Sequence, residues 1–482
     1  MVKMRRYVKY SAVALCLILL TALAIALSGC GGNFDSEPAP TPQREFTDQL
    51  PIVQGDPNVH VTMTVENEGY DIFAPFFGGG GYRYGPSIIY YPNGSVDAWF
   101  ATPGTSGEWD WFTYKHSDDG GKTWRRRKEG EYPADFLMPN GCYFCGFDIK
   151  SAYTADELEN YPMAAKGASS GVFAAERLPK RYHPHCTATE YDPKTGELRR
   201  FDVTLNWRYV PLKFRFGALQ HNALLPIEYM IALDYPMGMV SKDGVLYYAI
   251  YARGLNSDAP TLEKAATDYR EGEDRVYILK SEDSGRTWNY VSNLAADDHI
   301  LRKKGCEGFC EPTMTVMPDG SFLMVMRMGT SAEPWIPPTP CYYTRSTDNG
   351  RTWSYPKVFD QMGVYPQLLT LGCGVTLSTY GRPKYHLRAT ADPSGKTWEA
   401  PVRIQLTDHA IEDRWSDHPM VIPDPNPTED EKWNSCYYSG LVPLDDHTAL
   451  MVYSDFQYPK PDESGPCRAV VVRTITVLQE AN

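Results

Sequence analysis

The sequence predicts an all-β protein built from repeated four-stranded units, on the strength of two recurring patterns. An eight-residue pattern, Ser-x-Asp-x-Gly-x-Thr-Trp, occurs three times, and a fourth copy has one extra residue before its glycine; the copies span 117–124, 281–288, 346–353 and 390–398. A second pattern, strand–turn–strand with Gly or Asp in the turn, recurs at 88–95, 241–248, 316–322 and 444–450. Several copies of one turn in a chain are typical of repeat architectures, so they indicate a β-propeller or a solenoid.

The octapeptide has the composition of a tight hairpin turn. Ser and Asp side chains can hydrogen-bond backbone N–H groups across such a turn, and Gly takes a position with positive φ. We expect the terminal Trp to anchor each hairpin in a hydrophobic core.

The spacing of these patterns predicts the number of units. The stretch between the first two octapeptides must hold at least one unit without the signature, and it has its own turn at 192–196. With units of about 45 to 70 residues, the span 50–482 accommodates six. We expect the strand 469–477 to close the repeat by pairing with residues 59–65, because an unpaired edge would be an aggregation hazard.

Helical patterns are scarce. Residues 152–165 and 259–268 have amphipathic character, but neither stretch is long enough to build a helical layer. The predicted fold is therefore all-β, a six-bladed β-propeller.

The composition restricts the function classes. The chain has 482 residues and a formal net charge of −13, from 60 acidic and 47 basic residues. No basic block offsets that charge, which argues against nucleic acid as a partner.

The N-terminal segment 1–30 differs in composition from the rest of the chain. Lysines and arginines precede an apolar run that ends in Leu27-Ser28-Gly29-Cys30. This ending favours a bacterial lipoprotein signal with acylation at Cys30, against the alternatives of a plain secretory signal or a short membrane anchor. Residues 31–50 are rich in glycine and proline at the start, which predicts a flexible tether. We expect residues 51–482 to form the propeller. We expect a lipid-anchored protein of the bacterial cell envelope, at the outer membrane or cell surface.

Export would place the chain in a compartment that permits disulfides. Nine cysteines remain beyond Cys16 and Cys30, an odd number, so at least one is unpaired. Cys142 and Cys145, with His183, His185 and Cys186, have the composition of a zinc site, but a disulfide or buried thiols are the favoured interpretation, and we expect no metal.

Four patches outside the octapeptides carry arginine, glutamate or tyrosine beside strand patterns, at 82–87, 311–327, 380–388 and 436–444. Together with the octapeptides they resemble the Asp-box sialidases, six-bladed propeller glycosidases that cleave terminal sialic acids with retention. In that family three arginines bind the substrate carboxylate, a tyrosine activated by a glutamate is the nucleophile, and an aspartate is the acid/base. The resemblance covers about 60–482 and implies no metal or organic cofactor.

The resemblance implies roles for two patches in the first two-thirds of the chain. Arg83, in Tyr-Arg-Tyr-Gly-Pro-Ser, is similar to the family's first arginine, although its proline is displaced by one residue. Glu311, followed by a strand, a Pro-Asp-Gly turn, a second strand and Arg327, is similar to the family's glutamate and second arginine. A hairpin brings its two ends together, so we expect Glu311 and Arg327 to lie close to each other.

The later patches imply the remaining site residues. Arg382 in Tyr-Gly-Arg-Pro resembles the third arginine, with Arg388 as the alternative. Tyr438 resembles the nucleophile, with Tyr437 as its local competitor. A neutral phenol suits attack beside a carboxylate, because it avoids driving one anion toward another.

The acid/base of the family lies on the loop between the first arginine and the first octapeptide. Asp110 fits this position by residue type, and Glu108 nearly as well. Their flanking tryptophans would desolvate a carboxyl group and raise its pKa, as a general acid requires. A solvated carboxylate beside core tryptophans is the alternative.

These expectations combine into a lipid-anchored exo-glycosidase that removes terminal sialic acid from glycoconjugates. One alternative is a hydrolase of another terminal 2-keto carboxylate sugar, of the Kdo type. Another is a propeller that binds glycans without catalysis, since octapeptide repeats alone build only the fold.

Overall fold

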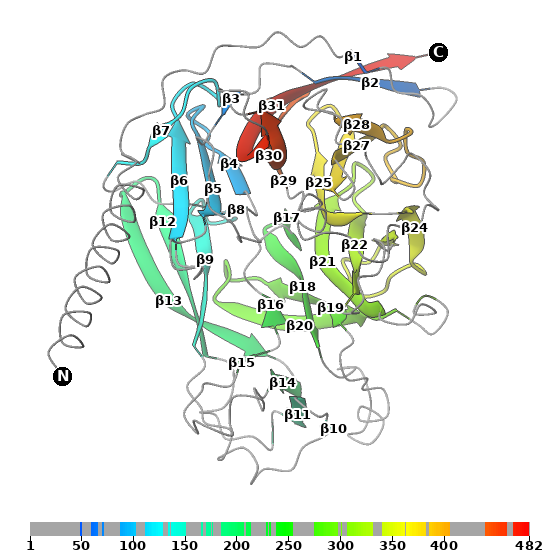
Figure 1. Ribbon diagram of the computed structural model, residues 1–482. Helices are drawn as coiled ribbons and strands as arrows, with labels where there is room; N and C mark the ends of the chain where they lie inside the picture. The colour runs from blue at the N-terminus through cyan, green and yellow to red at the C-terminus, as the bar shows by residue number, and fades with distance from the viewer. Residues whose placement is uncertain are drawn as a thin grey trace, which may run out of the picture. The chain divides into compact units, whose positions relative to one another are not determined.

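The structure is a computed structural model that describes residues between Gln49 and Ala481. The gaps are 51–58, 66–69, 72–86, 103–110, 129–133, 135, 151–164, 167–169, 175, 177–184, 207–208, 214–227, 230, 233–237, 254–273, 297–299, 301–305, 331–339, 362, 382–384, 405–438 and 460–465. Within the described residues every regular element is a β-strand, which confirms the all-β prediction (Figure 1). In this part of the chain no helix has the length and apolar character to cross a membrane.

Most of the described strands can be grouped into six sets of four by their antiparallel pairings, and we call each set a unit. Units 2, 3 and 4 belong to one thirteen-stranded sheet, in which short parallel pairings, β13 with β20 and β19 with β21, join them. Unit 1 contains β4 (Ser87–Tyr90), β5 (Val96–Thr102), β6 (Trp111–Ser117) and β7 (Arg125–Arg126). Unit 2 contains β8 (Phe136–Leu137), β9 (Tyr143–Lys150), β12 (His185–Asp192) and β13 (Glu197–Asn206). Unit 3 contains β17 (Met239–Lys242), β18 (Val245–Arg253), β19 (Asp274–Ser281) and β20 (Thr287–Leu294), with β16 (Ile231–Ala232) also paired to β18.

The other three units follow the same order of strands. Unit 4 contains β21 (Cys306–Val316), β22 (Phe322–Thr330), β23 (Cys341–Ser346) and β24 (Lys357–Asp360). Unit 5 contains β25 (Val364–Thr370), β26 (Thr376–Gly381), β27 (Tyr385–Thr390) and β28 (Val402–Ile404). Unit 6 contains β29 (Ser439–Pro443), β30 (Thr448–Pro459), β31 (Pro466–Ala481) and β2 (Val59–Val65), with the short β1 (Gln49–Leu50) and β3 (Tyr70–Asp71).

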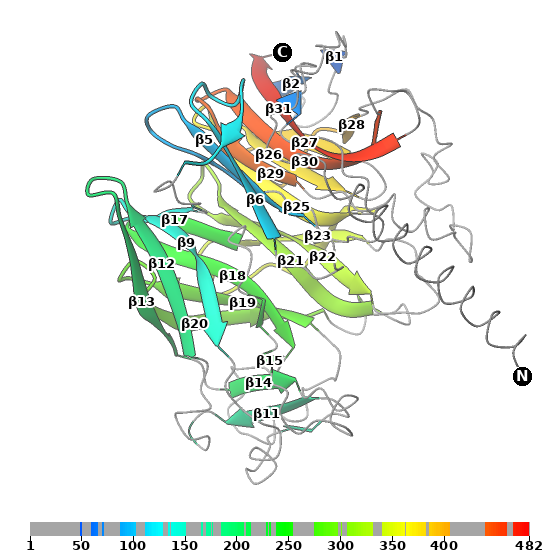
Figure 2. The same ribbon diagram turned by 60° about the vertical axis from the view of Figure 1, so that its left-hand side comes forward.

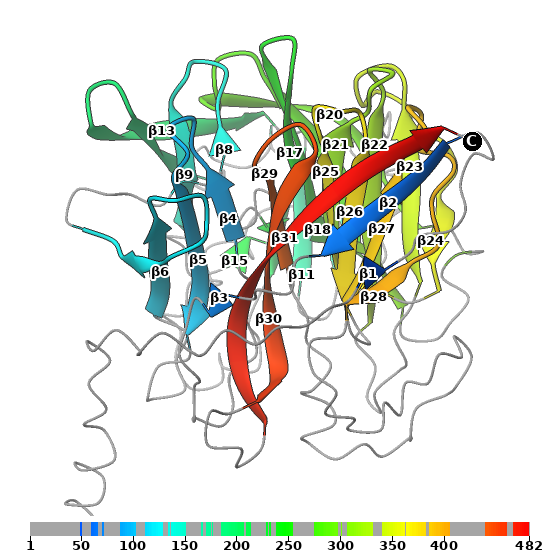
Figure 3. The ribbon, with the colours of Figure 1, turned by 90° about the horizontal axis from the view of Figure 1, so that it is seen from above.

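The N-terminal strand β2 completes the last unit. It pairs antiparallel with β31 from Val59 opposite Ala481 to Val65 opposite Ile475 (Figure 3). This pairing confirms the predicted closure of residues 59–65 on the C-terminal strand. The two ends of the repeat are thereby joined within one sheet.

The predicted turns lie at equivalent places in the units. The four strand–turn–strand segments are the β4–β5, β17–β18, β21–β22 and β29–β30 hairpins. Each octapeptide connects the third strand of a unit to its fourth, in units 1, 3, 4 and 5. Unit 2 has the 192–196 turn at this place, where Asp192 Oδ1 accepts the Lys194 N–H at 2.9 Å.

The octapeptide turns have the expected hydrogen bonds. In the third copy Ser346 Oγ accepts the Gly350 N–H at 2.9 Å and donates to Asp348 Oδ1 at 2.7 Å. Asp348 Oδ1 also accepts the Thr352 N–H at 2.9 Å, and the Trp353 indole donates to the Gly350 carbonyl at 3.1 Å. Gly350 has a φ of +79°, as its place in the turn requires.

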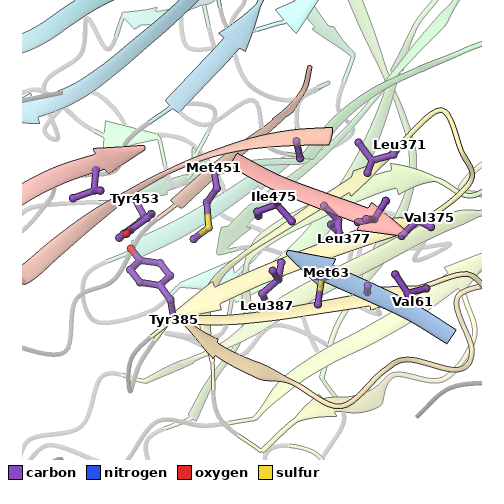
Figure 4. Close-up of a cluster of buried hydrophobic side chains, with 14 residues drawn as sticks. Val61, Met63, Leu371, Val375, Leu377, Tyr385, Leu387, Met451, Tyr453 and Ile475 are labelled. Atoms are coloured by element: carbon purple, nitrogen blue, oxygen red, sulfur yellow. The ribbon is translucent and has the colours of Figure 1, made fainter. Parts of the chain in front are cut away.

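Among the described residues, a hydrophobic cluster lies at each junction between consecutive units, and one cluster joins unit 6 to unit 1. Ring contacts mark four of these junctions: Tyr91–Tyr143 (units 1 and 2), Tyr247–Phe322 (3 and 4), Phe359–Tyr380 (4 and 5) and Tyr385–Tyr453 (5 and 6; Figure 4). The cluster between units 2 and 3 contains Cys186 and Leu246, and that between units 6 and 1 contains Leu450 and Val96. Each unit therefore buries its apolar faces against its two neighbours.

A separate four-stranded sheet comes from the stretch between the first two octapeptides. It consists of β10 (Ala165–Lys166), β11 (Ser170–Ala174), β14 (Tyr209–Lys213) and β15 (Glu228–Tyr229), as Figure 2 shows in part. The chain enters this sheet between β9 and β12 and again after β13. Apart from Ala165, the stretches considered for short helices lie outside the described residues.

Candidate functional site

Three of the residues that the sequence analysis proposed for the site are described: Glu311, Arg327 and Arg388. The others lie outside the described residues, namely Arg83, Glu108, Asp110, Arg382, Tyr437 and Tyr438, together with Cys30. The structure does describe strands that lie next to several of these residues in the chain.

Glu311 and Arg327 form an ion pair across the middle of the β21–β22 hairpin. Arg327 Nη1 donates to Glu311 Oε1 at 2.8 Å, and the side chains of Arg327 and Glu311 are 16% and 14% exposed. The register explains the contact, because Arg327 lies opposite Cys310, the residue before Glu311. The expected closeness of these two residues is therefore confirmed, and a charge-assisted bond of this kind is stronger than a neutral one.

The second carboxylate oxygen of Glu311 is held by the neighbouring unit. Glu311 Oε2 accepts the backbone N–H of Tyr365, on β25, at 2.9 Å. Glu311 thus receives hydrogen bonds from its own hairpin and from the first strand of unit 5. Its carboxylate is fixed in orientation, as a catalytic or binding group must be.

The backbone is left-handed at both partners of this contact. Glu311 has a φ of +46° and Tyr365 a φ of +51°, and each lies at a β-bulge and precedes a proline. For non-glycine residues this conformation costs about 1 to 3 kcal/mol, and such residues concentrate at functional sites. Units 4 and 5 therefore share a left-handed residue before a proline on their first strands.

Sequence reasoning did not identify Tyr365. The signal was present, because Tyr365-Pro366 opens an apolar strand just as Glu311-Pro312 does one unit earlier. An X-Pro pair is common, however, and only the shared bulge and the hydrogen bond distinguish this one.

The remaining candidates lie outside the described residues, and only the described strands next to them in the chain can be compared. Arg83 precedes β4 and Tyr438 precedes β29, and each of these strands is the first of its unit. Arg382 follows β26, a second strand, and Asp110 immediately precedes β6, a third strand. Since antiparallel strands alternate in direction, the start of the first strand, the end of the second and the start of the third coincide. Glu311 and Arg327 lie near the middle of β21 and β22, respectively.

Contacts between described strands bring these ends together in units 5 and 6. Gly381, the residue before Arg382, pairs with Val364, the residue before Tyr365. Ser439, the residue after Tyr438, is hydrogen-bonded to Thr379 of β26, with 2.9 Å between the two hydroxyl oxygens.

Arg388, the alternative third arginine, has structural partners. Its Nε donates to the Glu399 carbonyl at 3.0 Å and its Nη1 to the Phe359 carbonyl at 2.6 Å. Its guanidinium also lies over the rings of Phe359 and Trp398, at 4.8 and 6.0 Å from their centroids. Arg388 joins units 4 and 5, and Arg382 remains the proposed residue for a carboxylate site.

The described cysteines of the group considered for zinc form no disulfide. Cys142 and Cys186 are buried and Cys145 is partly exposed, with no disulfide at any of the three. Burial raises the pKa of the Cys142 thiol. Among the residues that the structure describes, no group of three or more His, Cys, Asp or Glu side chains is arranged to hold a metal ion.

Comparisons with known proteins give structural similarity only. No protein-family model matches the chain, and no curated protein matches it. Among solved structures, an α-L-arabinanase of Penicillium chrysogenum in complex with arabinobiose has a TM-score of 0.46 at 13% identity, over 85% of this chain and 98% of that one. An α-L-arabinofuranosidase of Fusarium graminearum has a TM-score of 0.45 at 13% identity, over 84% and 97%. A Hadza microbial sialidase has a TM-score of 0.44 at 12% identity, over 84% and 68%. TM-scores below 0.5 at such identities assign no substrate to this chain.

Proposed function

We propose that the six units are the blades of a β-propeller and that the chain is a retaining exo-glycosidase of sialidase type. Its substrate would be a glycoconjugate that ends in sialic acid. The observation that carries this proposal is the carboxylate of Glu311, held by Arg327 and by the Tyr365 amide at the junction of units 4 and 5. The hydrophobic clusters that join each unit to the next, and unit 6 to unit 1, support the propeller.

In the proposed mechanism three arginines bind the carboxylate of the sugar. Arg83, Arg327 and Arg382 suit this role because a guanidinium is permanently charged and presents paired donors. Arg327 would bind the substrate while it keeps its bond to Glu311, since its five N–H groups exceed what one carboxylate oxygen accepts.

The chemical step would be a double displacement. Tyr438 attacks the anomeric carbon as its proton passes to Glu311, and Asp110 protonates the departing glycosidic oxygen. A water molecule then attacks the anomeric carbon and breaks its bond to the Tyr438 oxygen, while Asp110 accepts the proton of the water. Tyr438 leaves as a phenol with the proton returned from Glu311, so the second step restores the enzyme.

We further propose that the mature chain begins at an acylated Cys30 and is anchored in a bacterial envelope membrane, with 31–50 as the tether. This part of the proposal rests on the charged, apolar and Leu-Ser-Gly-Cys succession at the start of the sequence. Labelling with an alkyne fatty acid in a bacterial host, with Cys30→Ser as the control, tests it. Label retained by the variant would refute it.

The test of the activity is a panel of terminal sugars on one chromogenic aglycone: N-acetylneuraminate, Kdo, a neutral hexose and arabinofuranose. We expect turnover of N-acetylneuraminate, with the α anomer as the first product in NMR. Turnover of the Kdo glycoside alone would keep the carboxylate site and replace the substrate. Binding of sialylated glycans without turnover would support the non-catalytic alternative.

A further inference from the structure

The first half of strand β21 is held by unit 3 as well as by its own hairpin. Gly308 pairs in parallel with Asp274, the first residue of β19, and this pair joins the backbones of units 3 and 4. On the other side the segment 308–310, which we call the arm, pairs antiparallel with residues 327–329 of β22. The arm therefore lies between strands of two units.

The approach of the arm to β19 leaves no room for a side chain at Gly308. A Cβ there would lie 2.2 Å from the carbonyl oxygen of Asp274, whereas ordinary contact begins at 3.4 Å. The obstacle is a backbone atom, which cannot rotate away as a side chain could. The two backbones would have to separate by about 1 Å to admit the Cβ. The φ of Gly308, +93°, favours glycine as well.

Phe309 anchors the arm in the hydrophobic cluster between units 3 and 4. Its side chain is 0% exposed, and it belongs to the cluster that contains Val276 and Ile278 of β19. Its ring also meets the ring of Tyr342 edge to face, with 5.4 Å between the centroids. Gly308 and Phe309 thus fix the arm by two different means, a backbone contact and a packed ring.

The arm ends directly before Glu311. Cys310, its last residue, lies opposite Arg327, and Glu311 forms its ion pair with the same arginine from the next position. The register of β21 with β22 then skips Glu311 and Pro312 and resumes at Thr313. Since consecutive Cα atoms are about 3.8 Å apart, a displacement of the arm is passed to the backbone of Glu311.

We propose that Gly308 and Phe309 are positioning residues for Glu311, so that unit 3 sets the place of this carboxylate together with units 4 and 5; the inference rests on the proposed function. A proton acceptor must lie within hydrogen-bond reach of the group that it serves, at roughly 2.6 to 3.2 Å between heavy atoms. A misplacement of about 1 Å can lower the rate about 100-fold. The separation that a side chain at Gly308 demands is of this size.

The junction between units 3 and 4 offers a matched control for each residue. Gly350 of the third octapeptide has a φ of +79°, and a Cβ there would lie 3.1 Å from Ile278 Cγ2 of unit 3. Phe322, the first residue of β22, is 0% exposed in the cluster that anchors the arm, and its ring meets Tyr247 edge to face with 4.9 Å between centroids. Gly350→Ala and Phe322→Leu therefore perturb the same junction away from the arm.

The kinetic experiment measures kcat and KM on the sialoside for Gly308→Ala, Phe309→Leu, Gly350→Ala and Phe322→Leu. We expect Gly308→Ala to lower kcat about 100-fold and Phe309→Leu about 10-fold, with smaller changes in KM, because the proton acceptor is misplaced. Both control variants should keep kcat within about twofold of wild type although they destabilise the junction. Wild-type kcat in both arm variants, or an equal loss of kcat in the controls, would overturn the inference.

A second measurement does not depend on turnover. Glu311→Gln weakens the ion pair with Arg327, and urea unfolding measures its cost in free energy in the wild-type, Phe309→Leu and Phe322→Leu backgrounds. If the arm holds Glu311 in place, this cost is smaller in Phe309→Leu, where the pair is already displaced, and unchanged in Phe322→Leu. Equal costs in all three backgrounds would overturn the inference even if Gly308→Ala does not fold. If the wild type turns over no terminal carboxylate sugar, the proposed function fails, and these unfolding data still decide whether the arm positions Glu311.

Discussion

Glu311 receives the guanidinium of Arg327 on one carboxylate oxygen, at 2.8 Å, while its other oxygen accepts the Tyr365 amide. The ion pair lies within unit 4, and the hydrogen bond from the Tyr365 amide joins Glu311 to unit 5. The site is therefore built at a junction, so that a change in one partner affects both the fold and the proposed chemistry.

The first prediction concerns the cost of removing Arg327. Arg327→Ala leaves the largely buried Glu311 carboxylate without its charged partner, so the free energy of unfolding should fall by about 1 to 3 kcal/mol. The value of kcat/KM on the sialoside should fall by more than this loss of stability explains. In the proposed mechanism Arg327 also binds the substrate carboxylate throughout the reaction, and the variant loses that contact. Urea unfolding and steady-state kinetics on the same preparations measure both. Wild-type kcat/KM in this variant would remove Arg327 from the binding site.

The second prediction concerns the nucleophile. Tyr438→Phe removes only a hydroxyl and should abolish retaining hydrolysis, with the unfolding midpoint near wild type. A 2,3-difluoro sialic acid should label the wild-type protein at Tyr438, located by peptide mass spectrometry, and Tyr437→Phe should still be labelled. Label on Tyr437 or on any other residue would show that the nucleophile is assigned wrongly.

The third prediction separates the two candidate arginines. Arg388→Ala loses two hydrogen bonds to carbonyls and two ring contacts, so it should destabilise the fold and leave KM near wild type. Arg382→Ala should do the opposite, with a raised KM, a lowered kcat/KM and little change in stability. If Arg382→Ala has wild-type kinetics, the third carboxylate ligand is misplaced.

The fourth prediction concerns two adjacent glycines in the first octapeptide turn. Gly120 and Gly121 have φ values of +73° and +91°. A Cβ on Gly121 would lie 2.6 Å from Leu450 Cδ2 in unit 6, whereas a Cβ on Gly120 meets nothing within 4 Å. Both Ala variants should lose about 1 to 2 kcal/mol from the left-handed backbone, and Gly121→Ala about 1 to 3 kcal/mol more from the clash. Urea unfolding measures both losses of free energy. Equal losses in the two variants would show that Leu450 moves aside for the new methyl group without destabilising the junction between units 6 and 1.

The fifth prediction follows from the acidity of the octapeptide aspartates. Burial alone would raise the pKa of Asp348, but hydrogen bonds from Thr352, Ser346 and the Arg351 N–H outweigh burial and lower the pKa to about 2, from an ordinary value of 3.8. A carboxyl whose pKa is lowered in the folded state stabilises it above the unfolded pKa, and this stabilisation disappears as the pH falls through the folded pKa. The stability difference between wild type and Asp348→Asn should therefore be constant above about pH 5 and shrink from pH 4 toward pH 2. A difference that does not change with pH would show that Asp348 contributes no charge-dependent stability.

The sequence by itself determined the elements and their order. The four octapeptides and the four Gly- or Asp-containing hairpins are local patterns, set by turn chemistry and by the period of the strands. The pairing of 59–65 with the C-terminal strand is long-range, and it could be predicted because an unpaired edge strand must be covered. Glu311 and Arg327 could be predicted to meet because a single hairpin with a Pro-Asp-Gly turn fixes which residues face each other.

Contacts between units were decided only by the tertiary structure. Three contacts join strands of different units: the hydrogen bond from the Tyr365 amide to Glu311, the Thr379–Ser439 hydrogen bond, and the contact of Arg388 with Phe359. No local pattern sets the relation between two such strands, since it depends on how two whole sheets pack through clusters of apolar side chains. The candidate site lies at those junctions, and that is why its residues could be named from the sequence while their arrangement required the fold.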